Sequence, residues 1–150
     1  MPTATLNGID IYYELHGSGP RLLLLKGSGG TIAAAAPMIQ KLAARFEVLI
    51  HDQRGLGRTT VPHGTPTMSD YAADDAALLD HLDWPSSLVF GTSFGGMVAQ
   101  EFAALAPPTN SKAIASRIAD SELRGYRGGH GFVGQVREAL PEIISFLSAL

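Results

Sequence analysis

The composition of this 150-residue chain excludes several classes of protein. A net charge of -3 with only 17% charged residues gives no basic surface for nucleic acid, and the absence of cysteine excludes disulfides, thiolate metal sites and a cysteine nucleophile. The length suits a single domain over residues 1–150 with one hydrophobic core. The chain start lacks a signal-peptide pattern and no apolar run is long enough to span a bilayer, so we expect a cytoplasmic protein without membrane partners.

The N-terminal part of the chain predicts a hairpin followed by a buried strand. Residues 5–15 place β-branched and aromatic residues around Asn7-Gly8, which is a strong signal for two antiparallel strands. The apolar run over 21–25 predicts a strand buried on both faces. A glycine-rich loop ends this strand, and a helical pattern follows over 33–46. A dinucleotide-binding loop would need a further glycine where Ile32 stands, so this interpretation is disfavoured.

The next strand and helix carry polar residues that allow more than one interpretation. A strand is predicted over 47–50, and His51 and Asp52 follow it. A metal pair is disfavoured because adjacent residues of a strand point to opposite faces and no third ligand is apparent, which favours a structural turn. Thr67 and Asp70 form a capping box for the following helix. The acidic residues of that helix are predicted to form a solvated face; they are Asp74, Asp75 and Asp80.

A later apolar run breaks at a Gly-x-Ser-x-Gly pattern, from Gly91 to Gly95, and resumes with helical character. This arrangement predicts a strand, a sharp turn at Ser93 and a helix. Both glycines are needed because the strained turn brings backbone segments too close for side chains. Ser93 is therefore a candidate nucleophile, and the free N–H groups of the helix start favour negative charge beside it. A phosphate loop is excluded because Met97 stands where its lysine would be.

The rest of the chain predicts a helix over 110–119, a weaker strand over 121–127 and an amphipathic closing helix over 137–150. From the buried strand over 21–25 to the helix after Ser93, strands and helices alternate three times. This order predicts an α/β fold with parallel strands and right-handed crossovers.

These motifs resemble the α/β-hydrolase fold superfamily, of the esterase, lactonase and perhydrolase type. Residues 22–30 resemble the strand and oxyanion loop of this family, with Lys26 in place of the usual histidine. Residues 52–57 resemble its second glycine turn, and residues 128–130 resemble its catalytic-histidine loop. The resemblance implies a reduced hydrolase core with a mostly parallel sheet, an N-terminal antiparallel hairpin and helices on both faces. It also implies a mechanism without cofactor or metal, in which Ser93 is the nucleophile, His130 is the base, and the backbone N–H groups of Ser28 and Phe94 form the oxyanion hole.

The chain departs from this family between about Ala104 and Pro107. The sixth strand, the cap, the seventh strand and the triad acid are absent there, which predicts a deletion junction near 104–109. A shorter sheet has an exposed edge, so we expect a homodimer or another homo-oligomer formed through that edge.

No carboxylate replaces the missing acid in the sequence. Asp120 and Glu122 precede the strand that leads to His130 and would lie at its opposite end. Glu101 is on the helix after the elbow and is expected to point away from the serine. We therefore name no triad acid.

The resemblance predicts weak cleavage of small carboxylic esters, because loss of the triad acid lowers turnover while the oxyanion hole is retained. The alternative is a catalytically inactive core that binds a ligand or itself. Lactonase, perhydrolase and lyase chemistry stay open, whereas a haloalkane-dehalogenase-like mechanism would need an aspartate in place of Ser93. Lys26 either places a cation near the oxyanion loop or extends to solvent, and the second is the commoner behaviour of lysine.

Overall fold

The computed structural model describes residues 2–105 and 139–149. Its strands are β1 (Thr3–Leu6), β2 (Ile9–His16), β3 (Arg21–Leu25), β4 (Glu47–His51) and β5 (Leu88–Gly91). Its helices are α1 (Ile32–Ala43), α2 (Met68–His81), α3 (Phe94–Leu105) and α6 (Ala139–Ser148). The predicted closing helix is therefore present as α6, which belongs to a separate compact unit and is described by itself. The predicted helix over 110–119, the predicted strand over 121–127 and His130 lie outside the described residues.

The five described strands form one mixed sheet in the order β1-β2-β4-β3-β5. β2 pairs antiparallel with β1 and with β4, whereas β3 pairs parallel with β4 and with β5. The predicted hairpin and α/β fold are confirmed, and the antiparallel pairing extends one strand beyond the hairpin. Leu25 lies opposite Gly91 in the pairing of β3 with β5, so the loops that leave these two strands begin at the same edge of the sheet.

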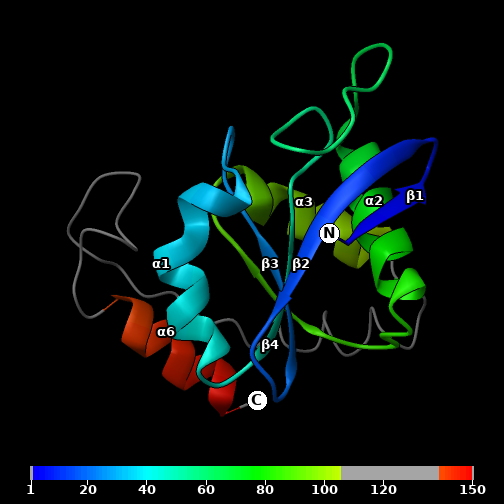
Figure 1. Cartoon of the computed structure of the whole chain (residues 1–150). Helices are drawn as coiled ribbons and strands as arrows, with labels where there is room; N and C mark the ends of the chain where they lie inside the picture. The colour runs from blue at the N-terminus through cyan, green and yellow to red at the C-terminus, as the bar shows by residue number, and fades with distance from the viewer. Residues whose placement is uncertain (1, 106–138, 150) are drawn as a thin grey trace. The chain divides into compact units, whose positions relative to one another are not determined.

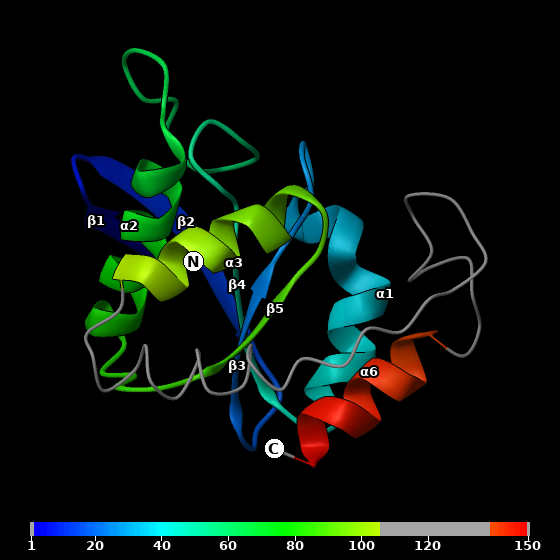
Figure 2. The same cartoon turned by 180° about the vertical axis from the view of Figure 1, so that it is seen from behind.

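Helices cover both faces of this sheet. Figures 1 and 2 show α1 on one face and α2 with α3 on the other. Leu23, Leu25 and Leu49 belong to a hydrophobic cluster with residues of α2 and α3. The alternate residues Leu22 and Leu24 are equally buried and, by the two-residue period of a strand, face the layer of α1. The prediction of a strand buried on both faces is confirmed for β3.

Threonine caps set the start of α1 and of α2. The Thr31 side chain accepts a hydrogen bond from the N–H of Ala34. Thr67 accepts from the N–H of Asp70, whose carboxylate accepts from the N–H of Thr67 at 2.7 Å, which confirms the predicted capping box. None of the helices in the described ranges combines the length and the apolar character needed to cross a membrane.

The prediction of a solvated acidic face on α2 is wrong for two of its three residues. Asp74 is 2% exposed and accepts two hydrogen bonds of 2.7 Å from the Arg54 guanidinium and one of 3.0 Å from Asn7. Asp75 is fully buried, with Oδ1 at 3.4 Å from Nε2 of His51. Of the three, only Asp80 is exposed. The Arg54 guanidinium makes the burial of the Asp74 carboxylate tolerable, because a buried charge without a partner is strongly destabilising.

Burial also sets the protonation of the His51–Asp75 pair. It lowers the pKa of His51 to about 4, and the charge of Lys26 lowers it further. Burial raises the pKa of Asp75 well above its usual range, with the charge of Asp74 acting in the same direction. Burial therefore favours a folded pair in which Asp75 carries the proton and His51 is neutral, whereas the unfolded chain protonates His51 below pH 6.5. The lowered pKa of His51 makes the folded state less stable as the pH falls, and the raised pKa of Asp75 acts in the opposite direction, so the two shifts offset each other.

Replacing Asp75 with asparagine should remove this balance. The unfolded chain then binds a proton at His51 that the folded chain does not bind, so the free energy of unfolding falls as the pH falls from 6.5 to 4. We expect Asp75→Asn to lose about 3 kcal/mol over this window, and the unchanged chain to lose less because the proton on Asp75 offsets part of the loss. Urea unfolding of both proteins at a series of pH values measures the difference, and parallel stability curves would contradict the assigned protonation.

Candidate active site

Ser93 occupies the sharp turn between β5 and α3, where the strand runs directly into the helix (Figure 2). Its φ angle is 53°, in the left-handed region that costs a residue other than glycine roughly 1–2 kcal/mol. The turn is closed by a hydrogen bond of 2.9 Å from the N–H of Gly95 to the carbonyl of Thr92 and one of 2.8 Å from the N–H of Gly96 to the carbonyl of Ser93. Ser93 itself is exposed. The predicted strand, turn and helix are confirmed.

Two glycines allow the backbone to approach itself at this turn. A Cβ at Gly91 would clash with the backbone of Gly95, and a Cβ at Gly95 would clash with the carbonyl groups of Leu25 and Lys26. The start of α3 therefore rests directly on the end of β3. This contact is the physical reason for glycine at both ends of the Gly-x-Ser-x-Gly pattern.

The glycine-rich loop over 26–30 lies against Ser93. A Cβ at Gly27 would lie 3.3 Å from the Cβ of Ser93 and 3.8 Å from its Oγ. The N–H of Thr92 donates to the carbonyl of Leu25 at 3.0 Å, which ties the elbow to the strand that precedes the loop. The structure thus brings together the loop and the elbow that the sequence predicted as parts of one site.

The two residues predicted to form the oxyanion hole lie on these two segments. Ser28 is exposed in the loop. Phe94 is the first residue of α3, so its N–H has no partner within the helix. Its ring packs edge-on against Tyr71, with the ring centroids 5.1 Å apart, and this contact holds the helix start in place.

Lys26 does not extend to solvent, which was the commoner of the two interpretations of its sequence position. It is 4% exposed, and its Nζ lies 3.4 Å from Oδ1 of the equally buried Asp52. Burial lowers the pKa of Lys26, whereas the charge of Asp52 and that of Glu14 oppose the shift. The preferred interpretation of His51 and Asp52 as structural is supported, since the one lies against Asp75 and the other against Lys26.

The remaining members of a catalytic triad are not placed by the structure. His130, predicted as the base, lies outside the described residues, as do Asp120 and Glu122. Glu101 accepts a hydrogen bond of 2.6 Å from the Ser69 hydroxyl of α2. In the described part of the chain, no group of three His, Asp or Glu side chains is arranged to hold a metal ion.

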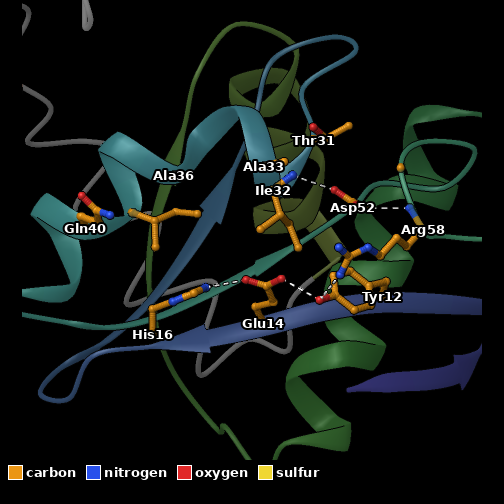
Figure 3. Close-up of a pocket in the computed structure, with 12 residues that line it drawn as sticks. Tyr12, Glu14, His16, Thr31, Ile32, Ala33, Ala36, Gln40, Asp52 and Arg58 are labelled. Carbon is orange, nitrogen blue, oxygen red and sulfur yellow. Dashed lines mark hydrogen bonds and ion pairs between the residues drawn. The ribbon is translucent and has the colours of Figure 1, made fainter. Parts of the chain in front are cut away.

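A cavity of ≈ 400 Å³ lies between β2 and α1 (Figure 3). Its polar wall is a hydrogen-bonded chain in which Glu14 accepts from the Tyr12 hydroxyl at 2.6 Å and lies 2.7 Å from Nε2 of His16. Arg58 donates to the Tyr12 hydroxyl at 2.6 Å, and the hydrogen bonds to Glu14 lower the pKa of this carboxyl. This cavity was not predicted from the sequence. The two-residue spacing of Tyr12, Glu14 and His16 on one strand face was the signal.

Comparison with known proteins gives one family. The model of the alpha/beta hydrolase fold matches residues 20–123. RutD of Azorhizobium caulinodans, described as a carbamate hydrolase, is 37% identical over 107 residues, which are 71% of this chain and 40% of that protein. BpoC of Mycobacterium tuberculosis, described as a non-heme bromoperoxidase, is 33% identical over 108 residues, 71% of this chain and 41% of that protein. The chain thus spans about two fifths of the length of these curated relatives.

Solved structures give the same result. The enol-lactonase from Burkholderia xenovorans LB400 has a TM-score of 0.66 at 30% identity, over 69% of this chain and 42% of that one. The epoxide hydrolase CorEH has a TM-score of 0.66 at 33% identity, over 70% of this chain and 37% of that one.

The neighbouring glycines Gly95 and Gly96 give a matched test of the close approach at the elbow. We expect Gly95→Ala to lower the free energy of unfolding by roughly 1–3 kcal/mol, because its Cβ meets fixed backbone. Gly96→Ala should instead raise it by up to ~1 kcal/mol, since its Cβ would lie 3.6 Å from the nearest atom and alanine favours a helix. Urea unfolding measures both, and equal effects would contradict the packing of α3 on β3.

Proposed function

Because the chain belongs to the α/β-hydrolase fold family, we propose that it is a serine hydrolase that cleaves small carboxylic esters. The geometry of Ser93 carries this proposal: the residue is exposed, held at φ 53° and lies against a glycine-rich loop. A strained turn in a folded protein persists only where its surroundings determine it, and such turns cluster at functional sites.

The proposed reaction has two steps. Oγ of Ser93 forms a bond to the ester carbonyl carbon while its proton passes to His130, and the N–H groups of Ser28 and Phe94 hold the negative oxygen of the tetrahedral intermediate. The intermediate expels the alcohol, which takes the proton from His130. Water then attacks the acyl group on Ser93 by the same route and releases the carboxylic acid. No acid orients His130 in this scheme, and such a loss costs about four orders of magnitude in turnover.

The names of two similar proteins support a carbonyl substrate. Carbamates and enol lactones, named for RutD and for the enol-lactonase, both contain a carbonyl carbon that a serine can attack. We propose small activated esters as the first substrates to test, because Ser93 is exposed and Met97, one turn further along α3, is 53% exposed. A site this open suits a small substrate.

Labelling with a fluorophosphonate tests the nucleophile. We expect the intact chain to be labelled at Ser93, Ser93→Ala to be unlabelled, and His130→Ala to be labelled at least about a hundredfold more slowly, since general base catalysis contributes 10²–10⁴. Ser86→Ala, at an exposed serine before β5, is the matched control and should label at the unchanged rate. Absence of labelling in the folded intact chain would overturn the proposal.

A second candidate function is a catalytically inactive core that binds a ligand or itself. The cavity between β2 and α1 favours a small ligand, and the position of β5 favours self-association, because it is the edge strand of the described sheet and its residues are only half-buried. An open edge pairs readily with a second strand.

Sedimentation equilibrium of the intact chain tests the self-association. We expect a homodimer at micromolar concentration that dissociates on dilution. A single species of 15.8 kDa at all concentrations would contradict association through the sheet edge.

A further inference from the structure

We infer that Lys26 and Asp52 are positioning residues, which hold the oxyanion loop over 26–30 in place against Ser93. This inference rests on the proposed serine hydrolase function and assigns to it two residues outside the nucleophile, the base and the oxyanion hole.

The carboxylate of Asp52 binds both ends of the loop. Its Oδ1 lies 3.4 Å from Nζ of Lys26, the first residue of the loop, and accepts a hydrogen bond of 2.8 Å from the N–H of Ile32, just beyond the last. Its Oδ2 accepts a hydrogen bond of 3.1 Å from the N–H of Arg58. Figure 3 shows Asp52 between Ile32 and Arg58. One buried side chain thus connects the two ends of the loop and attaches them to the turn after β4.

The side chain of Lys26 also supports the loop from within. A Cβ at Gly30 would lie 3.0 Å from the Cβ of Lys26 and 3.6 Å from its Cδ, so the aliphatic part of the lysine packs directly beneath the loop backbone. The loop itself is closed by a hydrogen bond of 3.0 Å from the N–H of Gly30 to the carbonyl of Gly27. Since Gly27 contacts Ser93, a shift of Lys26 or Asp52 moves the segment that carries the N–H of Ser28 relative to the nucleophile.

The charges around Lys26 make this support dependent on its ammonium group. Asp52 and Glu14 favour the charged form, burial disfavours it, and the lysine in turn lowers the pKa of His51. The side chains of Lys26 and Asp52 are 5% and 4% exposed. The attraction between their opposite charges therefore compensates for the hydration that both lose on burial. Because burial prevails and lowers the pKa of Lys26, the ion pair is lost at a lower pH than a pair with an exposed lysine would be.

The experiment compares Lys26→Met with Lys41→Met, a matched change at an exposed lysine of α1. Steady-state hydrolysis of p-nitrophenyl acetate gives kcat and KM, and amide hydrogen exchange followed by NMR reports the N–H of Ile32. We expect Lys26→Met to lower kcat about 100-fold, the effect of a misplacement of about 1 Å, with KM changed less than twofold and with faster exchange at Ile32. Lys41→Met should change none of these quantities.

Lys26→Arg is the second variant, and it keeps the inference testable if Lys26→Met does not fold. Arginine keeps its charge at all accessible pH values, so we expect Lys26→Arg to retain part of kcat. The pH at which kcat decreases on the alkaline side should be higher in this variant than in the intact chain. A kcat for folded Lys26→Met within threefold of the intact chain would overturn the inference, as would an unchanged alkaline limb in Lys26→Arg.

The two proposals fail in different ways. If the intact chain hydrolyses no ester, or if Ser93→Ala hydrolyses it equally well, the proposed function fails. The exchange at Ile32 then still decides whether the pair holds the loop: faster exchange in Lys26→Met supports the positioning role, and unchanged exchange overturns it.

Discussion

The contact between the start of α3 and the end of β3 determines the geometry of the candidate site. Gly95 lies directly on the carbonyl groups of Leu25 and Lys26, and Gly91 lies on Gly95, so no side chain separates these backbones. The turn that leads into this contact holds Ser93 in the left-handed region, at φ 53°. The cost of that turn is offset by the packing of α3 on a core that includes Leu25 and Val98. Strain at one residue and close packing at its neighbours are therefore two aspects of one arrangement.

The parallel pairing of β3 with β5 explains why the loop and the elbow meet. Neighbouring parallel strands have their carboxyl ends on the same side of a sheet, and the register places Leu25 opposite Gly91. Each strand is followed by a glycine-rich turn, and each turn leads into a helix on a different face of the sheet (Figures 1 and 2). Ligands of α/β proteins commonly bind at such an edge, where loops diverge to opposite faces. The buried carboxylate of Asp52 adds a third segment to this site, the turn that follows β4, which is the strand next to β3.

The sequence was sufficient for the features that depend on local patterns. The hairpin at Asn7-Gly8, the buried run of β3 and the elbow were each predictable from residues a few positions apart, because turn chemistry and side-chain period are local properties. The buried polar groups were not predictable. Asp74 binds Asn7, 67 residues away, and Lys26 meets Asp52, 26 residues away, so nothing near them in sequence distinguishes them from solvated charges. His130 remains a prediction because it lies outside the described residues.

Under the proposed function Ser93 forms a covalent acyl intermediate, which can be trapped and located on the chain. The intact chain is mixed with excess p-nitrophenyl acetate, quenched in acid within seconds, digested and analysed by peptide mass. We expect one added acetyl group, located on the peptide that contains Ser93 and absent from that peptide in Ser93→Ala. An acetyl group found only on lysine or tyrosine, or none at all in a folded chain that hydrolyses the ester, would contradict it.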